Sequence, residues 1–452
     1  MDDIKSWVRR AYSLRHVQVI NDHIAESQRW ASNHPRNALY GALFIITLLY
    51  VLAKIVQQLR KKAAASTSRA GTPDLEREKP HVSGESKKNR FACEVPGEWK
   101  PSPFRRPAAA PYPDWNIETT KPLAYRPFRP RYYVTMGLRS MPWDSWIELD
   151  NEFPKFHARK AERIASRADK CCATAPEAFD GAIELLEEFC DYLPQRYPSL
   201  YRKTKVGMDN LLTGEKFNIT ERPLVEDPMA MAARMVQDDL ALMFEGKDGQ
   251  YYLKAGAILL AGFWRLQDKL GMPLSEIHTS GDVPQYREKL EKGMMNFFRR
   301  LKPETPFCRN NYFVQVDDDL AWSRSIGDED EEGHSWDTAE KDKAIEHHHF
   351  RSERQGLRRL PRTGAILFTI RTYFAPIPSI ASEPYVPGRL ASAVRSWTDD
   401  VAKYRGRARY GDVLLEYLDR KHGEQVEAGV VGEGEFEDEE GIEKGVGRGY
   451  PF

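Results

Sequence analysis

The sequence predicts an α+β protein in which an antiparallel sheet with surrounding helices follows a single transmembrane helix. Segments with apolar residues at helical spacing are mixed with segments of strand character over residues 131–422. The two kinds of segment do not alternate regularly, which favours an antiparallel sheet over a doubly wound parallel one. An almost wholly apolar run near the N-terminus predicts the membrane helix.

The elements of the globular part follow from these patterns. Residues 175–193 are expected to form an amphipathic helix that ends before Pro194. Residues 283–301 are expected to form a second helix with a proline in its first turn, and residues 227–243 a third. Strands are expected at 250–261, 311–316, 347–355 and 364–374.

The transmembrane helix is predicted at residues 37–59. Residues 38–53 read ALYGALFIITLLYVLA, and about 20 predominantly apolar residues span a bilayer. Lys54 can extend its amine to the interface. Polar flanks argue against a buried core helix, and the long polar segment before the run argues against a cleaved signal peptide. More Lys and Arg follow the helix than precede it, which predicts a single-pass membrane protein with a cytosolic C-terminal domain.

The remaining segments are predicted to be tethers, loops and tails. Residues 1–36 show an amphipathic helical pattern, and residues 60–130, rich in basic residues, Ser, Gly and Pro, suit a flexible linker that becomes an extended strap. Residues 317–342 are dense in Asp and Glu without EF-hand spacing, which favours a solvated loop over a calcium site. Residues 423–452 contain few large apolar residues and are expected to be disordered.

Charge and cysteine content argue against several functions. The chain has 67 basic and 67 acidic residues, so its zero net charge provides no field for attracting nucleic acid, and nucleic acid is not expected as a partner. The five cysteines show neither a CxxC pair nor zinc-site spacing. Free thiols in a reducing compartment are therefore favoured over a disulfide framework.

Residues 262–283, GFWRLQDKLGMPLSEIHTSGDV, form the first segment that can carry chemistry. They follow an expected buried strand, and His278 lies where the pattern changes, before Thr-Ser-Gly. A neutral imidazole at such a turn can bind haem iron or another metal. The alternative is a structural histidine that is only hydrogen-bonded, because buried polar side chains usually find a partner.

Residues 347–362, HHHFRSERQGLRRLPR, form the second such segment. In an extended strand, alternation places five side chains on one face: His347, His349, Arg351, Glu353 and Gln355. Two histidines and a carboxylate on one face can bind non-haem iron. Alternatively, the arginines pair with the propionates of a haem through charge-assisted hydrogen bonds. A solvated basic strand is the third interpretation.

Several long motifs give the sequence a recognisable identity at the family level. FRSERQGLRRLPRTGAILFTIRTYFAPI, VTMGLRSMPWDSWIELD and FWRLQDKLGMPLSEIH together resemble the haem-dependent oxidative N-demethylase-like family, over residues 132–420. The resemblance implies a PAS-like antiparallel sheet around a b-type haem, which oxidises a secondary amine with oxygen and releases formaldehyde. It also implies electron delivery by partners that carry flavin and an iron–sulfur cluster. This chain shows no flavin or iron–sulfur motif, so a separate reductase is expected.

The chain departs from the family pattern in its predicted membrane anchor, its acidic segment and its three adjacent histidines. Before Trp264 it reads LLAGF, where many relatives carry a Pro-Ser pair. These departures bear on the identity of the amine more than on the haem.

The sequence thus predicts a membrane-anchored haem oxidase or monooxygenase, with His278 as the ligand of the haem iron. Glu353 is expected to hold a cationic amine or to transfer a proton. Arg351 or Arg354 is expected to stabilise negative charge on activated oxygen. The expected cofactor-binding arginines are Arg351, Arg358 and Arg359.

Two rival functions remain at this point. One is a non-haem iron oxygenase that uses His347, His349 and Glu353. The other is a non-enzymatic sensor of haem or another ligand. The partners expected for the favoured function are a small amine, oxygen, a separate reductase and, through one helix, membrane lipid.

Overall fold

The computed structural model describes residues 95–432, and the segments 1–36 and 37–59 lie outside the described residues. Among the described helices, none combines the length and the apolar composition needed to cross a bilayer. The two longest of them carry charged residues in every turn. This finding corrects the predicted fold class and localisation: neither a preceding transmembrane helix nor a single-pass membrane protein with a cytosolic domain is supported.

The fold is built on a seven-stranded antiparallel sheet with the strand order β1-β8-β9-β10-β6-β7-β2. Its strands are β1 (Arg139–Ser140), β2 (Cys172–Thr174), β6 (Asp239–Glu245), β7 (Tyr251–Ala257), β8 (Phe307–Gln315), β9 (His349–Arg359) and β10 (Ile366–Pro376). A separate three-stranded sheet contains β3 (Tyr201–Lys203), β4 (Gly207–Asn210) and β5 (Lys216–Asn218). The architecture is therefore α+β with antiparallel sheets.

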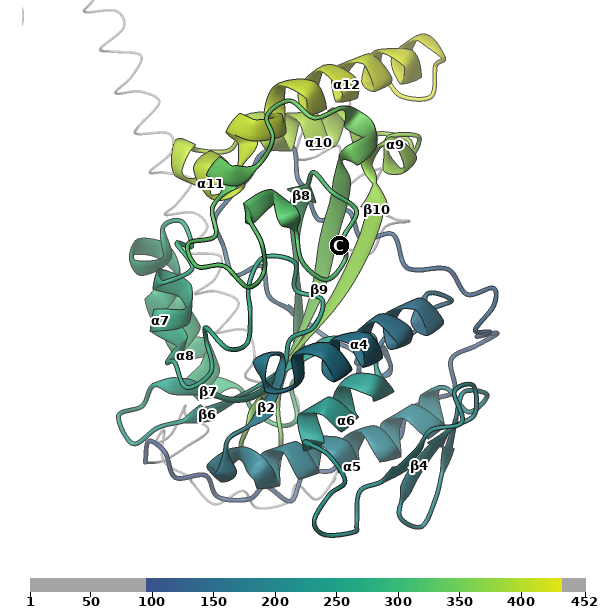
Figure 1. Ribbon diagram of the computed structural model, residues 1–452, viewed down its shortest axis with the longest axis vertical. Helices are drawn as coiled ribbons and strands as arrows, with labels where there is room; N and C mark the ends of the chain where they lie inside the picture. The colour runs from purple at the N-terminus through teal and green to yellow at the C-terminus, as the bar shows by residue number, and fades with distance from the viewer. Residues whose placement is uncertain (1–94, 433–452) are drawn as a thin grey trace, which may run out of the picture. The chain divides into compact units, whose positions relative to one another are not determined.

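Three groups of helices pack against the large sheet. The first group is α4 (Phe153–Arg167), α5 (Phe179–Arg196) and α6 (Pro228–Met235); the second is α7 (Leu274–Thr279) and α8 (Glu291–Arg300); the third is α9 (Ile377–Ile380), α10 (Val386–Arg395), α11 (Asp399–Tyr404) and α12 (Arg407–Glu427). Each group has its own apolar cluster with the sheet. Strands β9 and β10 run from the third group toward the first (Figure 1).

The predicted helix at 227–243 is wrong in its second half, where the chain forms a strand. Asp227 caps α6 by accepting a hydrogen bond from the Met229 amide, and the helix ends at Met235. After a bend, β6 pairs with both β10 and β7. Leu240 and Leu242 pack with the first helix group, while alternate residues pack with the second. A strand that is apolar on both faces has the same sequence pattern as a buried helix. Only its hydrogen-bonded pairing with neighbouring strands distinguishes the two.

Most other predicted elements are present, with shifted ends. Helix α5 is confirmed, but it continues through Pro194 to Arg196. The helix predicted at 283–301 is a π-helical turn (Tyr286–Leu290) followed by α8. The predicted strands correspond to β7, β8, β9 and β10.

The acidic segment 317–342 is anchored to the protein along much of its length. The Asp317 carboxylate accepts hydrogen bonds from the hydroxyls of Ser323 and Ser325. Trp336 packs on Gly406, where a Cβ atom would lie only 2.1 Å from the indole. Four of the segment's eight exposed acidic side chains lie at the tip, residues 328–332. The segment is therefore solvated at these acidic side chains and held to the protein by its other residues.

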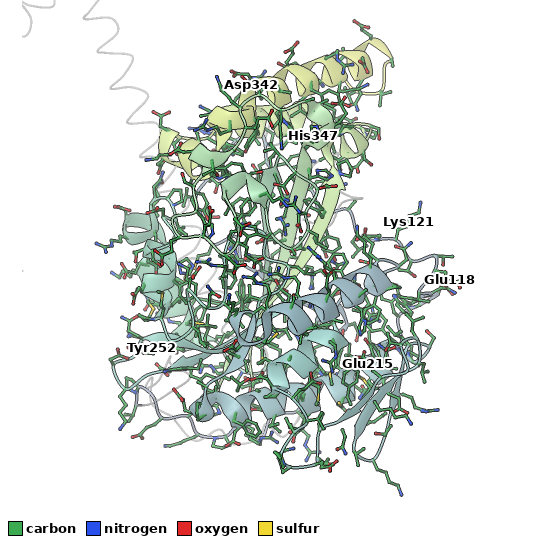
Figure 2. The ribbon with its side chains drawn as sticks, viewed as in Figure 1. Glu118, Lys121, Glu215, Tyr252, Asp342 and His347 are labelled. Atoms are coloured by element: carbon green, nitrogen blue, oxygen red, sulfur yellow. The ribbon has the colours of Figure 1, made fainter. Side chains whose placement is uncertain are left out.

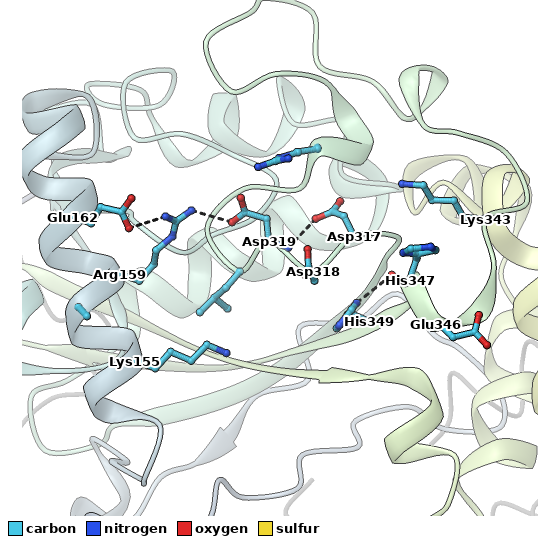
Figure 3. Close-up of a pocket in the computed structure, with 13 residues that line it drawn as sticks. Lys155, Arg159, Glu162, Asp317, Asp318, Asp319, Lys343, Glu346, His347 and His349 are labelled. Atoms are coloured by element: carbon cyan, nitrogen blue, oxygen red, sulfur yellow. Dashed lines mark hydrogen bonds and ion pairs between the residues drawn. The ribbon is translucent and has the colours of Figure 1, made fainter.

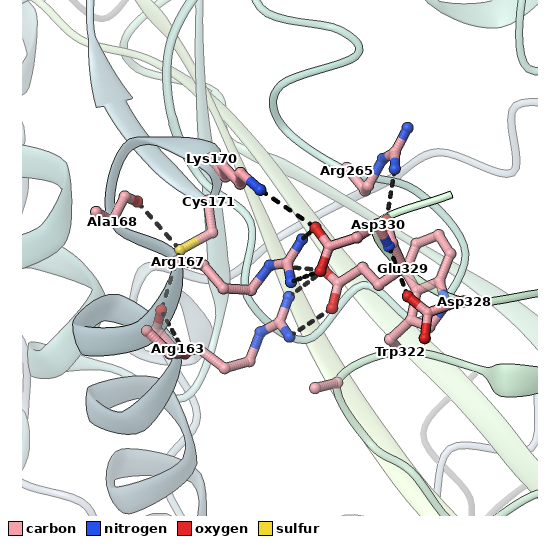
Figure 4. Close-up of polar contacts among 12 residues, drawn as sticks. Arg163, Arg167, Ala168, Lys170, Cys171, Arg265, Trp322, Asp328, Glu329 and Asp330 are labelled. Atoms are coloured by element: carbon pink, nitrogen blue, oxygen red, sulfur yellow. Dashed lines mark hydrogen bonds and ion pairs between the residues drawn. The ribbon is translucent and has the colours of Figure 1, made fainter. Parts of the chain in front are cut away.

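The tip is tied down by ion pairs with α4 (Figure 4). Arg163 binds Glu329 with an Nη1–Oε2 distance of 2.8 Å, and Arg167 Nε lies 3.3 Å from Glu329 Oε1. Arg265 donates to the Glu329 carbonyl oxygen. Because these partners are largely buried, they are screened little by water.

Replacing Glu329 with glutamine should lower the free energy of unfolding by about 2 kcal/mol, the usual worth of hydrogen bonds to a charged group. Urea unfolding measures the change. Glu332→Gln, at an exposed position of the same tip, is the matched control and should change stability by less than about 0.5 kcal/mol. Equal effects of the two variants would show that the Arg163 pair does not hold the segment.

Candidate functional site

Strand β9 carries most of the predicted site residues, and its register divides them between two faces. Pairing with β8 and β10 places Arg351, Glu353 and Gln355 on one face, which we call the α8 face because α8 packs there. Arg354 and Arg358 lie on the opposite face, which we call the α5 face. The register thus confirms the predicted alternation from His349 onward, whereas His347 precedes the strand.

Arg351 lies on the predicted face, but protein groups already engage its guanidinium. Nη1 donates to the Leu260 carbonyl oxygen at 2.9 Å, Nη2 to that of Leu320 at 2.6 Å, and Nε to Gln315 Oε1 at 3.2 Å. The guanidinium also lies 5.1 Å from the ring centre of Phe374. Burial lowers the pKa of Arg351 to about 10, so the group stays charged at neutral pH. These contacts make Arg351 a structural cation rather than a free haem ligand.

The chain accommodates this guanidinium by placing a glycine against it. A Cβ atom at Gly262 would lie 2.7 Å from Cζ of Arg351, and Gly262 has φ +78°, a conformation that favours glycine. Strand β9 and the loop after β7 are therefore joined tightly at this point.

The other predicted arginines are also engaged. Arg354 pairs with Glu148 at 3.1 Å and donates to two backbone carbonyls on the α5 face. Arg358 pairs with Glu188 at 2.9 Å on the same face. Arg359 donates to the carbonyl oxygens of Leu301, Phe298 and Gly364. None of the three is placed to meet a ligand on the α8 face next to Glu353.

Glu353 forms the centre of a polar row on the α8 face. Gln355 Nε2 donates to Glu353 Oε2 at 2.8 Å, and Arg309 of β8 donates from Nη1 to Gln355 Oε1 at 2.7 Å. Burial raises the pKa of Glu353, against the attraction of Arg351 and Arg309. Within the described contacts, Nη2 of Arg309 has no hydrogen-bond partner. The row therefore offers one carboxylate and one cationic N–H group to a ligand.

His278 lies in the last turn of α7, with one ring nitrogen engaged and the other available. Nδ1 contacts the Leu274 carbonyl oxygen at 2.7 Å, so Nδ1 must carry the proton and Nε2 the lone pair. Burial lowers the pKa of His278, which keeps the imidazole neutral. The ring stacks on Tyr286 with centroids 4.8 Å apart. This tautomer and neutrality suit an imidazole that binds a metal through Nε2.

Three titratable side chains on the α8 face keep accessible surface. Burial lowers the pKa values of His278 and Arg309 and raises the pKa of Tyr404 to about 12. All three side chains are nevertheless only half-buried. Their remaining accessible surface allows these groups to meet a ligand on this face. Half-buried apolar side chains on this side are Leu138, Trp264, Ile277, Met294, Met295, Phe297, Phe307 and Phe368.

The alternative iron site is not assembled in the structure. In the part of the chain that is described, no three His, Cys, Asp or Glu side chains are placed to hold a metal ion. His347 is exposed in a short turn before β9, and His349 stacks on Phe374 at 4.8 Å. Figure 2 shows His347 near helix α12, where the turn that carries it contacts that helix. Glu353 lies on β9, four residues after His349.

His347 and His349 instead line an open groove of 1030 Å³ (Figure 3). Its walls are α4, the segment around residues 317–320 and the turn before β9. Arg159 bridges Glu162 at 2.8 Å and Asp319 at 3.3 Å across one wall. Acidic and basic side chains are mixed along the groove, so its charge selects no particular ligand.

The middle histidine of the triplet, His348, is fully buried. Because of this burial we expect the protein to lose stability in acid. Nε2 contacts the Lys343 carbonyl oxygen at 3.0 Å, and burial lowers the pKa of His348 to about 4. The unfolded chain then takes up the proton first as pH falls below about 6.5. Stability is lost between that pH and about 4, by up to about 3 kcal/mol.

Urea unfolding of the wild type and of His348→Gln at neutral and acidic pH tests this expectation. The difference in stability between the two proteins should shrink or reverse as pH falls, because only the wild type titrates at this position. A difference that does not change with pH would contradict it.

Sequence reasoning singled out Glu353 and His278 as candidates but not the residues that contact them. Arg309 lies in a strand whose pattern shows only alternation, and Tyr286 lies in the π-helical turn after His278. The paired glutamine was noted as a neighbour on the strand face, without a role. The signal for Arg309 was a charged residue inside a half-buried strand.

A family model described as haem-dependent oxidative N-demethylase, alpha subunit-like, matches residues 137–415, more than half of the chain. The matched region includes the whole large sheet and the helices α4 to α11. It therefore contains His278, Arg309 and Glu353. The chain belongs to the haem-dependent oxidative N-demethylase, alpha subunit-like, family.

Proposed function

We propose that this chain binds haem in a hollow on the α8 face and removes a methyl group from a small amine with oxygen. Membership of the family supports haem-dependent oxidative chemistry at the family level. The observation that carries the proposal is His278, a neutral imidazole whose Nε2 carries no contact among the described residues. A separate reductase would supply the electrons.

The residues around the hollow fit a haem. Tyr286, stacked on His278, has a buried hydroxyl without a hydrogen-bond partner among the described residues, so a polar group of a ligand can bind there. The apolar side chains of the second helix group suit the flat face of the macrocycle. Arg309 suits a carboxylate of the haem through a charge-assisted hydrogen bond. In this proposal Arg309 takes the role that the sequence gave to Arg358 and Arg359.

When bound, haem iron supplies the oxygen chemistry, and the chain supplies position, charge and exclusion of water. His278 Nε2 would bind the iron, with Nδ1 held by the Leu274 carbonyl oxygen. Glu353 would hold a protonated amine or transfer a proton, and Gln355 orients its carboxylate. The apolar wall limits the entry of water.

The absorption spectrum of the purified full chain, produced with an adequate supply of haem, tests the proposal. A Soret band with stoichiometric haem is expected. Addition of a secondary amine, oxygen and an electron donor should then release formaldehyde. The absence of haem would overturn the proposal, and haem without formaldehyde from any methylated amine would favour a sensor.

A further inference from the structure

The four buried arginines of β9 differ in how many of their nitrogen atoms find an acceptor. In Arg351 and Arg359, Nε, Nη1 and Nη2 each donate to an oxygen atom of the protein. Arg354 likewise uses all three nitrogens, on a carboxylate and two backbone carbonyls. Arg358 donates only from Nη1, to Oε2 of Glu188 at 2.9 Å. Its Nε and Nη2 are buried and have no hydrogen-bond partner among the described residues.

The two unbonded nitrogens of Arg358 form one edge of the guanidinium. In this planar group the Nε–H and Nη2–H bonds lie side by side and point in the same direction. Such an edge matches the two oxygens of a carboxylate, which it binds through two parallel hydrogen bonds. A buried donor without an acceptor is costly, and a charged donor more so. The edge therefore calls for an acceptor that no protein group in the described ranges supplies.

Two tryptophans hold the Arg358 guanidinium in place, and one of them adds a third donor. Its Cζ lies 4.9 Å from the ring centre of Trp143 and 4.3 Å from that of Trp146. Trp143 begins a short 3-10 helix, and Trp146 follows it directly. Nε1 of Trp146 is buried and, in the part of the chain that the structure describes, also lacks a hydrogen-bond partner. The open edge thus lies beside a further unsatisfied N–H group.

Arg106, from the segment that precedes β1, brings a second guanidinium to the same carboxylate. Its Nη2 pairs with Asp191 at 2.8 Å, and its Nε lies 3.7 Å from Oε2 of Glu188, the oxygen that Arg358 already uses. The Arg106 side chain is only 3% exposed, and Glu188 is 20% exposed. Two arginines therefore share one carboxylate oxygen, and the donors outnumber the acceptors in this cluster.

The electrostatic balance of Arg358 agrees with a missing anion. Burial lowers the pKa of Arg358, and the carboxylates of Glu188 and Glu184 oppose this without reversing it. The charge of Arg106 lowers the pKa further. Arg354 is similarly buried, but its protein partners outweigh burial and raise its pKa. An anion at the open edge would provide Arg358 with the compensation that Arg354 obtains from the protein.

We propose that the Nε–Nη2 edge of Arg358 and Nε1 of Trp146 form a binding site for a small planar oxyanion of the carboxylate class, such as formate. Two oxygens of the anion would accept from Arg358, and the indole N–H would donate to one of them. The ligand must be small because the side chains around it are almost fully buried. The site lies on the α5 face, so it is separate from the proposed haem site on the α8 face.

The anion would connect parts of the chain that are distant in sequence. Arg358 belongs to β9, Glu188 to α5, Trp146 to the turn after β1 and Arg106 to the segment before it. A ligand that binds only the folded chain stabilises it in proportion to its occupancy. We therefore expect the stability of the protein to depend on a specific anion, independently of haem.

Urea unfolding of the full chain in sodium formate, against sodium chloride at equal ionic strength, tests the site. Formate should stabilise the wild type in a saturable manner. At about 100 times its dissociation constant it should raise the folding equilibrium constant by about 100-fold. Chloride should have a much smaller effect, because a single atom cannot accept two parallel hydrogen bonds in the geometry of a carboxylate. The equal ionic strength removes differences in general screening.

Three variants separate the site from general effects of formate on stability. Arg358→Lys keeps a positive charge for Glu188 but lacks the Nε–Nη2 edge, so it should lose the response to formate. Trp146→Phe keeps an aromatic ring without the N–H group and should bind formate about tenfold more weakly. Arg359→Lys is the matched control, because every nitrogen of Arg359 is already bonded. It should lose stability but keep the wild-type response.

A crystal structure of the wild-type chain in sodium formate provides a direct readout, even where a variant fails to fold. It should show a planar ligand across Nε and Nη2 of Arg358. An ordered water at this edge in the presence of formate would overturn the proposal. Equal stabilisation by formate and chloride, or an unchanged formate response in Arg358→Lys, would overturn it as well. None of these measurements requires haem, so they stand whether or not the proposed function holds.

Discussion

Replacing His278 with alanine should abolish haem retention by the purified full chain while leaving the fold intact. The imidazole is the one group of the α8 face that combines neutrality, a fixed tautomer and an available nitrogen among the described residues. Loss of a residue that hydrogen-bonds to a metal ligand usually lowers metal affinity by roughly 10- to 100-fold. Loss of the ligand itself should lower the affinity further. Haem content and the ferric absorption spectrum measure the effect.

The control for this substitution is His347→Ala, at an exposed histidine lining the groove. It should retain haem with an unchanged spectrum. Unfolding by urea should show that His278→Ala loses only about 1 kcal/mol, as expected for a half-buried side chain. A wild-type spectrum in His278→Ala would place the iron ligand elsewhere and remove the main support of the proposed function.

Replacing Arg351 with methionine should lower the free energy of unfolding by about 3–5 kcal/mol, because each buried acceptor left without a donor costs about 1–3 kcal/mol. The carbonyl oxygens of Leu260 and Leu320 and the amide oxygen of Gln315 would lose their donors while remaining buried. Arg351→Lys should be destabilised as well, because an ammonium group cannot reach these acceptors in the geometry of a planar guanidinium.

Arg324→Met is the matched control for Arg351→Met. Arg324 is exposed and lines the groove, so its loss should change stability by less than about 0.5 kcal/mol. Urea unfolding of both variants gives the comparison. An Arg351→Met protein that keeps its stability but loses amine oxidation would restore the catalytic role predicted from the sequence.

The sequence determined those features that depend on local pattern. Alternation along β9 predicted which side chains share a face with Glu353, and the register agrees, because successive residues of a strand point to opposite sides. The helix α5 was predicted from apolar spacing, and the family from long motifs in order. His278 was chosen as a candidate ligand because it lies where the pattern of its segment changes.

Other predictions failed where local pattern carries no information about partners. The segment 227–243 was predicted as a helix because a strand apolar on both faces has no period-two signature. The apolar run at 37–59 was predicted as a transmembrane helix from composition alone, and the described residues give that prediction no support.

Only the tertiary structure decided which charged side chains are available to a ligand. Arg351, Arg354, Arg358 and Arg359 look equivalent in the sequence, but the packing of the sheet gives each one protein partners. Arg309 becomes part of the site only because β8 pairs with β9 and brings it beside Gln355. A buried charge is satisfied by groups that are distant in the chain, so its role is set by the fold and cannot be read from its neighbours in sequence.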